Sequence, residues 1–169
     1  MKLSTLKILT ALLLILLFIT SCEPNEADPA SVVVGAQAPS FSLSALDGTT
    51  VKSDSLKGNV VILNFWATWC QPCMGEIPEL KQFAASSKAR VVGIALDQEG
   101  AKTIKPFVAS NQINYTVLVG NEELFQRFNG LGIPYTLVLD PSQRIVKIYR
   151  GPTTKESLEQ DLVAISRGA

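Results

Sequence analysis

Two cysteines separated by two residues are the side chains of this chain best suited to do chemistry. They stand in the segment Trp69-Cys70-Gln71-Pro72-Cys73, directly after an apolar run, residues 60–66, that is typical of a buried strand. A cysteine between a strand end and a helix N-terminus lies where backbone N–H groups and the helix dipole stabilise negative charge. Such a position lowers the thiol pKa and supplies a thiolate near neutral pH. The segment therefore predicts a redox-active pair.

The two thiols have different expected roles because of where the helix begins. Cys70 precedes the helix, so we expect its sulfur to be exposed and to act as the nucleophile. Cys73 lies one turn later, more shielded, and can close a disulfide with Cys70 as the resolving thiol. Of the flanking residues, Trp69 is expected to be half exposed as a flat apolar surface for a partner, whereas Trp66 is expected in the core.

Half a zinc site and a structural disulfide are the alternatives for this pair. Zinc normally takes four ligands, and the 169 residues include only three cysteines and no histidine. The absence of histidine also excludes Cys-His and Ser-His catalysis and haem attachment through Cys-x-x-Cys-His. We therefore favour redox chemistry, with no metal and no bound cofactor besides the disulfide itself.

The run Asn64-Phe65-Trp66-Ala67, followed by the cysteine pair, resembles the thioredoxin superfamily. The closer likeness is to its extracytoplasmic, membrane-tethered branch, the TlpA/ResA-like thiol–disulfide oxidoreductases, and it extends from about Val34 to the C-terminus. The resemblance implies a thioredoxin fold and protein thiols or disulfides as substrates. In this superfamily the dipeptide between the cysteines, here Gln71-Pro72, helps to set the reduction potential.

Glu76 follows Cys73 by three residues, so it should share its helix face and turn toward the sheet. A solvated surface glutamate is the commoner alternative. TlpA/ResA-like proteins carry an acidic residue at this step, whereas cytoplasmic thioredoxins place an aspartate in the strand, where this chain has Asn64. The resemblance implies that Glu76, partly desolvated and with a raised pKa, accepts the Cys73 proton as Cys73 attacks the mixed disulfide.

Gly132-Ile133-Pro134 resembles the cis-proline loop of the superfamily, although a simple turn at the start of a strand is the alternative. The likeness implies that Pro134 is cis and packs opposite Cys70, and that the backbone of Ile133 pairs with an extended substrate segment. The family often has Thr or Glu where this chain has Tyr135, so we expect an aromatic contact there. The predicted substrate-contact residues are Trp69, Pro72, Ile133 and Tyr135.

The rest of the chain supplies the elements that hold these residues. A hairpin is predicted over residues 41–51, with Asp47-Gly48 in its turn, and a strand over 60–66. Further along, the pattern predicts a strand over 90–96, a helix over 103–111 with Pro106 in its first turn, a strand over 115–119, a short helix capped by Asn121, a hairpin over 135–149, and a last helix opened by a capping box at Thr153-Thr154-Lys155-Glu156. The expected fold is α/β and thioredoxin-like: a mixed central sheet flanked by helices, with an N-terminal β-hairpin and a helix–strand insertion.

Residues 1–21 form a second strong pattern, which resembles a bacterial lipoprotein signal. Lys2 and Lys7 precede an apolar stretch of 12 residues, 8–19, which is shorter than the roughly 20 residues of a spanning helix. The stretch ends at Cys22, so we expect cleavage before this residue and a lipid on its sulfur. An uncleaved anchor and a plain secretory signal are the alternatives. Residues 22–33 are interpreted as a flexible tether and 34–169 as the thioredoxin-like domain.

Charge and cysteine count bound the function further. Fifteen basic and fifteen acidic residues give no electrostatic footprint for nucleic acid. With Cys22 carrying lipid, Cys70 and Cys73 remain as one isolated pair in an oxidising compartment. We expect a monomeric, membrane-anchored lipoprotein of the cell envelope, with its domain in the periplasm or on the outer surface.

The expected function is reduction of protein disulfides, either directly or as a relay re-reduced by a membrane electron donor. In the family, targets include apocytochrome c thiols and copper-site assembly proteins, and the sequence does not distinguish them. A peroxiredoxin-like thiol peroxidase is an alternative, but that chemistry uses a Thr three residues before its cysteine, where this chain has Ala67. A non-enzymatic metal chaperone is another, but such proteins pair Cys-x-x-x-Cys with a distant histidine.

Overall fold

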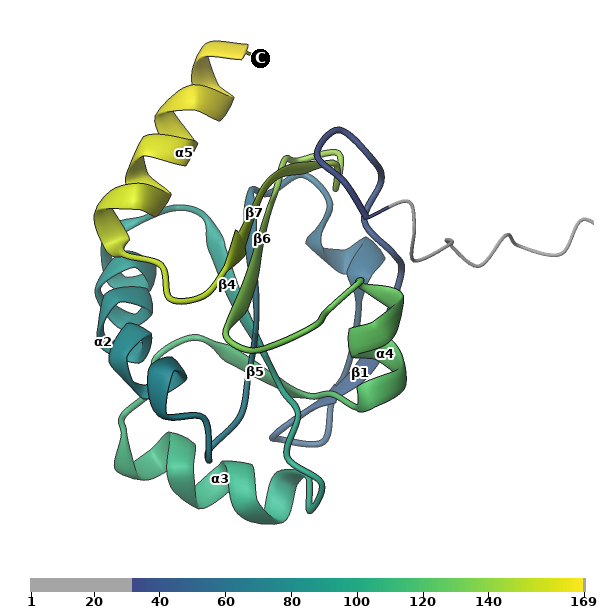
Figure 1. Cartoon of the computed structure of the whole chain (residues 1–169), viewed down its shortest axis with the longest axis vertical. Coiled ribbons are helices and arrows are strands. Elements are labelled where there is room, and N and C mark those ends of the chain that lie inside the picture. The colour runs from purple at the N-terminus through teal and green to yellow at the C-terminus, as the bar shows by residue number, and fades with distance from the viewer. Residues whose placement is uncertain (1–31, 169) are drawn as a thin grey trace, which may run out of the picture.

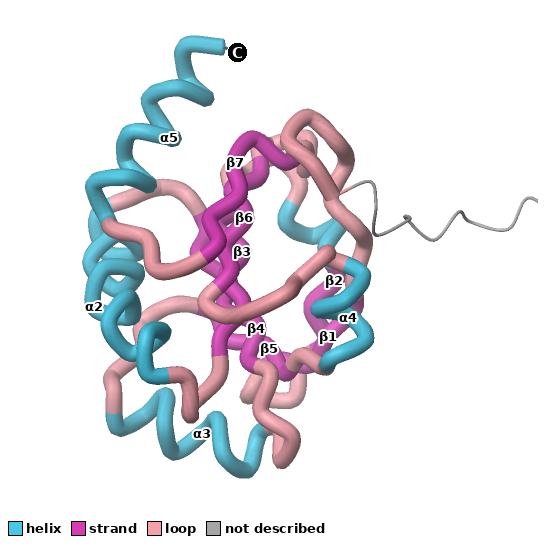
Figure 2. Tube along the Cα trace, in the orientation of Figure 1, coloured by secondary structure: helices cyan, strands magenta, loops and turns pink. Residues whose placement is uncertain are grey.

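A seven-stranded mixed sheet forms the centre of the molecule in the computed structural model, which describes residues 32–168. The strand order is β2-β1-β5-β4-β3-β6-β7 (Figures 1 and 2). The strands are β1 Ser42–Ala45, β2 Thr50–Lys52, β3 Val61–Trp66, β4 Arg90–Ala95, β5 Thr116–Val119, β6 Tyr135–Leu139 and β7 Ile145–Arg150. Strands β3, β4 and β5 are parallel, and the other pairings are antiparallel.

Helices cover both faces of this sheet. The helices are α2 Gln71–Ser86, α3 Ala101–Ser110, α4 Glu122–Arg127 and α5 Lys155–Gly168, with a short 3₁₀ turn, η2, at Ser53–Leu56. Helices α2, α3 and α5 lie on one side of the sheet and α4 on the other (Figure 1). The mixed sheet, the β1–β2 hairpin and the helix–strand segment α3–β5 confirm the predicted fold class.

Strand β3 is buried along its whole length because both of its faces are covered. Side chains alternate between the two faces of a strand, so Phe65 packs on the α4 side with Phe125 and Phe128. Ile62 packs on the other side against Leu80 of α2. Asn64 and Trp66 share the face of Ile62, so β3 delivers them to the same side as α2.

Two details of the predicted helices are wrong by one or two residues. Helix α3 begins at Ala101, so Pro106 is an interior residue and not a first-turn one. Because proline lacks an N–H, the carbonyl four residues before it receives no helical hydrogen bond. At α5, the Thr154 hydroxyl and not that of Thr153 accepts the N–H of Ser157, at 3.2 Å, as the helix cap.

The N-terminal predictions fall mostly outside the described residues. The signal peptide, Cys22 and most of the tether are among them. Val32, a residue of the predicted tether, is buried in the core. Between residues 32 and 168, the structure contains no helix with both the length and the apolar character needed to cross a membrane.

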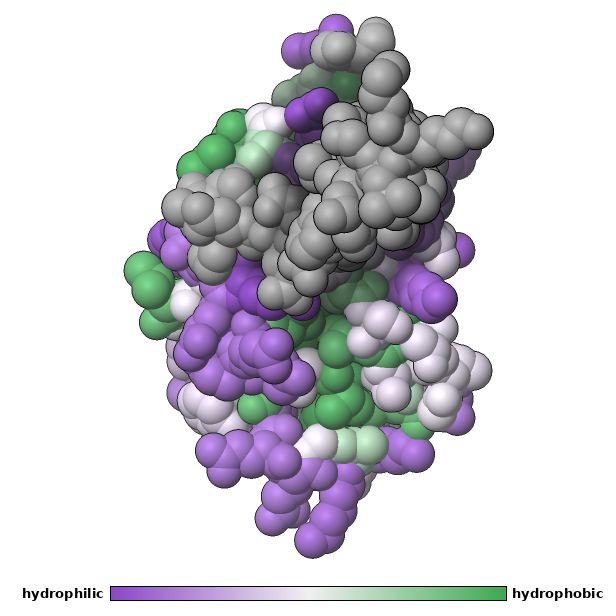
Figure 3. Space-filling view, turned by 90° about the vertical axis from the view of Figure 1, so that its right-hand side faces the viewer, coloured by the Kyte–Doolittle hydropathy of each residue, from purple (hydrophilic) through white to green (hydrophobic). Residues whose placement is uncertain are grey.

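On the part of the face that is visible in Figure 3, a strip of hydrophobic residues lies between more hydrophilic ones. The β1–β2 hairpin contributes partly buried Leu43 and Val51, which pack onto the core on the α4 side. The cysteine pair lies on the opposite side of the sheet, with α2.

Candidate active site

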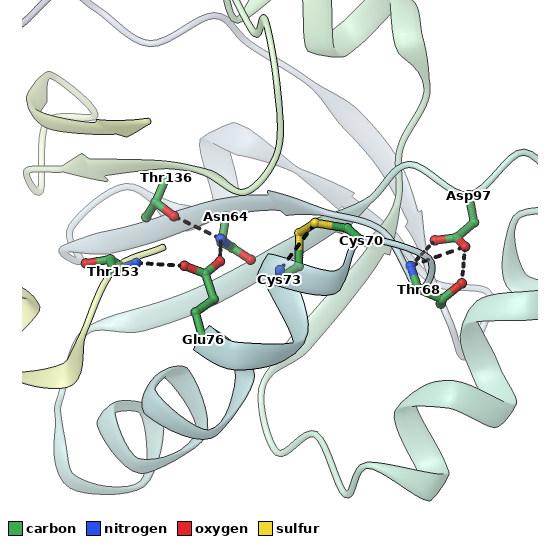
Figure 4. Close-up of a disulfide and its surroundings, with 8 residues drawn as sticks. All are labelled: Asn64, Thr68, Cys70, Cys73, Glu76, Asp97, Thr136 and Thr153. Atoms are coloured by element: carbon green, nitrogen blue, oxygen red, sulfur yellow. Dashed lines mark hydrogen bonds between the residues drawn. A yellow bond between two sulfur atoms is a disulfide. The ribbon is translucent and has the colours of Figure 1, made fainter. Parts of the chain in front are cut away.

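The cysteine pair spans the start of α2. Cys70 caps this helix in an extended conformation, and its sulfur accepts the backbone N–H of Cys73 at 3.2 Å. The two sulfurs form a disulfide (Figure 4), and Pro72 lies in the first turn, where no N–H is needed. In the reduced protein, the same N–H and the helix dipole would stabilise a Cys70 thiolate and lower the pKa of its thiol.

The disulfide is more shielded than the sequence suggests. Cys73 is fully buried, as expected, but Cys70 is only 4% exposed, which contradicts the prediction of an exposed sulfur. The reason is that Ala67 and Ile77 pack in the same apolar cluster, with Ile133 against it. Trp69, by contrast, is 70% exposed and stands beside the pair as a free aromatic surface.

Asp97 holds the loop that leads into Cys70. Its carboxylate accepts hydrogen bonds from the backbone N–H of Thr68, at 3.1 Å to the nearer oxygen, and from the Thr68 hydroxyl. Asp97 is buried and follows β4, the parallel neighbour of β3 (Figure 4). Sequence reasoning missed this residue. The sequence does contain an indication of it: Asp97 comes just after the carboxyl end of a parallel strand, and ligand and active sites of α/β sheets lie at that edge.

Among residues 32–168, Glu76 is the one carboxyl group in the buried layer between α2 and the sheet. It is 1% exposed, and its two oxygens accept hydrogen bonds from the Asn64 amide at 2.6 Å and the Thr153 backbone N–H at 2.9 Å. The same Asn64 nitrogen donates to the Thr136 hydroxyl at 2.8 Å, so a polar row crosses β3 and β6 beneath the helix (Figure 4).

Burial decides the ionisation of Glu76. Loss of hydration raises the pKa of this carboxyl to about 7, although both hydrogen bonds oppose the shift by favouring the carboxylate. A group with this pKa can take up or release a proton near neutral pH. Glu76 lies one helical turn after Cys73 on the buried face of α2, as expected, and its pKa is raised, as expected.

The loop before β6 contains the cis peptide bond Ile133–Pro134. The Ile133 side chain packs against the apolar cluster of the cysteine pair. Among the residues that the structure describes, none forms a backbone hydrogen bond with Ile133. The backbone of Ile133 is therefore free to pair with a segment from another molecule, whereas the Pro134 carbonyl accepts the N–H of Gly151 at 2.9 Å.

A groove of about 800 Å³ runs from Trp69 to this loop. Its walls are both apolar and acidic, with Leu131, Ile133, Phe125, Asp97 and Glu122 among the lining residues. Such a surface suits an extended segment that carries apolar or basic side chains.

Tyr135 does not belong to this surface. It is 1% exposed, pairs with Phe65 across β3 and β6, and therefore faces the α4 side of the sheet, away from the thiols. Its hydroxyl donates to the Phe128 carbonyl at 3.0 Å, and its ring packs edge-on against Phe125. The predicted aromatic contact with substrate at Tyr135 is wrong because the strand register turns this side chain into the core.

No group of three or more His, Cys, Asp or Glu side chains in residues 32–168 is arranged to hold a metal ion.

Residues 34–160 match the model of the AhpC/TSA family. The thioredoxin-like protein YneN of Bacillus subtilis is 33% identical over 132 residues, which cover 76% of this chain and 78% of that protein. The thiol-disulfide oxidoreductase ResA of Bacillus thuringiensis subsp. konkukian is 30% identical over 136 residues, or 79% of each chain. Among solved structures, a putative thiol:disulfide interchange protein DsbE of Chlorobium tepidum superposes with a TM-score of 0.73 at 29% identity, over 79% of this chain and 97% of that one.

Proposed function

Because this chain belongs to the AhpC/TSA family and is a thiol–disulfide oxidoreductase of thioredoxin-like fold, we propose that it reduces protein disulfides outside the cytoplasm. The observation that carries the proposal is the Cys70–Cys73 disulfide at the start of α2, with a helix N–H directed at the Cys70 sulfur. This geometry stabilises the thiolate that disulfide exchange requires.

The reaction begins from the reduced pair. The Cys70 thiolate attacks one sulfur of a target disulfide, so a mixed disulfide forms, the target S–S bond breaks and a target thiolate leaves. Cys73 then attacks the Cys70 sulfur, which forms the Cys70–Cys73 disulfide and releases the second target sulfur. Two electrons pass to the target, and a dithiol donor upstream must reduce the pair before the next cycle.

Glu76 is the proposed base for the second step. Cys73 attacks only as a thiolate, and it is fully buried, so its proton needs an acceptor within the protein. With a pKa of about 7, the Glu76 carboxyl is about half ionised at neutral pH and can accept that proton.

The proposed binding surface combines the backbone of Ile133, Trp69, Pro72 and Pro134 with the adjoining groove. An extended target segment would pair with the free backbone of Ile133, as an added strand pairs with a sheet edge, and lie against the exposed ring of Trp69. Acidic Asp97 and Glu122 in the groove favour targets with basic residues near their cysteines.

We further propose that Cys22 carries a lipid that anchors the monomeric protein to an envelope membrane, with the domain in the periplasm or on the outer surface. The support is the pattern of residues 1–22, an apolar stretch that ends in a cysteine. A membrane donor would then be the source of electrons, and cytochrome c maturation or a related thiol relay would be the pathway served.

The reduction potential of the Cys70–Cys73 pair tests the direction of this reaction. Equilibration of the protein with glutathione or dithiothreitol buffers should give a reduction potential of about −270 mV or lower, as for a reductase. A value near about −120 mV would mean that the protein installs disulfides, and the reductase proposal would be wrong.

Cysteine variants test the assignment of roles. Cys70→Ser should abolish disulfide exchange, and Cys73→Ser should accumulate mixed disulfides with targets, both visible by non-reducing electrophoresis. Retained turnover in either variant would contradict the mechanism.

A further inference from the structure

Four buried side-chain polar atoms in the described part of the chain have no hydrogen-bond partner within the protein. They are Trp66 Nε1, Tyr115 Oη, Thr153 Oγ1 and Arg127 Nε. Buried polar groups in native proteins almost always have a partner, either in the protein or as ordered water. Three of these four lie near the cysteine pair and Glu76: Trp66 and Tyr115 pack in the cluster that contains Cys73, and Thr153 donates its backbone N–H to Glu76.

Gly93 of β4 shows how Trp66 and Tyr115 come together. A Cβ atom at this position would lie 2.8 Å from Trp66 Nε1 and 3.2 Å from Tyr115 Cε2, so both rings occupy the space above the glycine. In the register of the sheet, Gly93 pairs with Asn64, whose amide donates to Glu76. The indole nitrogen and the Tyr115 ring therefore lie one strand away from the amide that holds the carboxyl group.

Thr153 lies on the side of the Glu76 carboxyl opposite to Asn64 (Figure 4). Its backbone N–H donates to one carboxyl oxygen at 2.9 Å, while its hydroxyl has no partner. Each oxygen of a carboxylate can accept two hydrogen bonds. Each Glu76 oxygen accepts one from the protein, from Asn64 and from Thr153, so both retain acceptor capacity.

The electrostatics also couple Tyr115 to Glu76. Burial raises the pKa of the Tyr115 phenol far above its ordinary value, and the negative charge of Glu76 raises it further. The hydroxyl therefore stays protonated at every physiological pH and remains a donor.

We propose that Tyr115 is a positioning residue for Glu76: its hydroxyl and the indole N–H of Trp66 hold an internal water that is hydrogen-bonded to the Glu76 carboxyl. A water with two or more polar partners is a regular part of buried polar sites. Here the water would donate a hydrogen bond to Glu76 and so stabilise its carboxylate form. The consequence for catalysis rests on the proposed function, because it concerns the group proposed to take the Cys73 proton.

Other charged and titratable groups around Glu76 could also change its pKa, and they come from several elements. Its own helix contributes Cys73 and Glu79, each one turn away, and Glu79 accepts the backbone N–H of Lys155 at 2.9 Å. Strands β3 and β6 contribute neutral groups, the Asn64 amide and the Thr136 hydroxyl. Strand β7 adds Tyr149, which pairs with Thr136 and whose hydroxyl donates to Asp161 of α5. The segment before β5 adds Tyr115.

The decisive measurement is the titration of the Glu76 carboxyl in the oxidised full-length protein, followed by carbon-13 NMR with labelled glutamate. Loss of the Glu76 signal in Glu76→Gln assigns it. Tyr115→Phe should raise the midpoint by about half to one pH unit, because the carboxylate loses a donor. Tyr135→Phe is the matched control: it removes a hydroxyl that donates to the Phe128 carbonyl at 3.0 Å on the other face of the sheet, and the midpoint should stay at the wild-type value.

An unchanged midpoint in folded Tyr115→Phe would overturn the proposal, since a merely unpartnered hydroxyl can be removed without effect on Glu76. A second measurement needs no tyrosine variant. The ¹H–¹⁵N signal of the Trp66 indole should show a cross-peak to water and shift with pH at the Glu76 midpoint, and this shift should vanish in Glu76→Gln. The exposed Trp69 indole is the internal reference, and a Trp66 signal that ignores the Glu76 titration would equally overturn the proposal.

Neither measurement depends on turnover. If the protein fails to reduce disulfides but Tyr115→Phe still moves the titration of Glu76, the proposed function fails and the water-mediated contact stands.

Discussion

At the scale of single residues, the chemistry of the site depends on one carboxyl group that the fold has removed from water. Glu76 sits one helical turn after Cys73, and burial outweighs its two hydrogen bonds in setting its pKa at about 7. A surface glutamate at the same helical position would stay ionised near neutral pH and would be a weak base. The local environment therefore converts an ordinary acidic residue into a proton acceptor.

Replacing this carboxyl should slow the second half of the reaction. In wild-type protein, resolution of a mixed disulfide should speed up as pH rises through about 7, because the carboxylate form is the base. Glu76→Gln should lower the rate by about 10²-fold and abolish that rise. Stopped-flow measurement of mixed-disulfide resolution between pH 5 and 9 tests this, with Glu79→Gln as the control that removes a charge elsewhere on α2. A Glu76→Gln profile that matches wild type would return Glu76 to a structural role.

The same pKa predicts how stability depends on pH. The folded pKa of about 7 lies above the ordinary value of 4.5, so the folded protein binds more protons than the unfolded chain between these values. Stability from this group is therefore fully present below pH 4.5 and is lost as pH rises through about 7, by about 3 kcal/mol in total. Urea unfolding of the oxidised protein at pH 5 and pH 8 should show this loss in wild type, and Glu76→Gln should reduce it. The assignment would be contradicted if the free energy of unfolding of the wild type rose from pH 5 to pH 8 and Glu76→Gln showed the same dependence on pH.

At the scale of elements, the site is built from the loop after β3, the loop after β4 and the loop before β6. Strand β3 stops at Trp66 and α2 begins at Gln71, so the connecting loop must be held for Cys70 to cap the helix. The end of β4 supplies that support through Asp97, which binds both the N–H and the hydroxyl of Thr68. The loop before β6 completes the site with its cis-proline and the free backbone of Ile133.

Removal of the Asp97 carboxylate should loosen this loop. Asp97→Ala leaves a partly buried N–H and hydroxyl of Thr68 without their acceptor, so the free energy of unfolding should fall by about 1–3 kcal/mol. Denaturant unfolding measures the loss, and alkylation of reduced Cys70 against pH should show a less acidic thiol. Gln98→Ala, at the next and exposed position, is the control and should leave both quantities unchanged. Equal behaviour of the two variants would mean that Asp97 does not position the loop.

At the scale of the whole molecule, the two faces of the sheet carry different groups. The side with α2, α3 and α5 carries the disulfide, Glu76 and the polar row, while the side with α4 carries the aromatic core around Phe65. Tyr135 illustrates the division, because its neighbour Thr136 faces Asn64 while Tyr135 itself enters that core. The disulfide and Glu76 therefore lie on one side of the sheet, and the residues of α4 that line the groove, Glu122 and Phe125, come from the other.

The proposed anchor is a property of the whole chain. Cys22→Ala should release the protein from membranes, because an apolar stretch of 12 residues ahead of a lost lipid site is too short to span. Fractionation of cells that express wild type and variant gives the answer, with Cys70→Ser as the control that keeps the anchor. Continued membrane retention of Cys22→Ala would favour an uncleaved N-terminal anchor.

Local chain properties explain what could be predicted here. The strand–helix transition that places Cys70 at a helix cap, the Asp47-Gly48 hairpin and the Asn121 cap depend only on neighbouring residues, and the structure confirms each. The mixed sheet followed from the alternation of strand and helix patterns together with the resemblance of the motif.

The amino-acid sequence by itself therefore determined the redox pair, its place at a helix N-terminus and the fold class. Tertiary structure alone decided the rest: the burial of Cys70, the core position of Tyr135, the support from Asp97 and the hydrogen bond that Thr153 gives to Glu76 across 77 positions of the chain. The physical reason is that hydration and strand register are set by packing between distant segments. A carboxyl's pKa depends on how much water those segments exclude, and no short window of sequence contains that information.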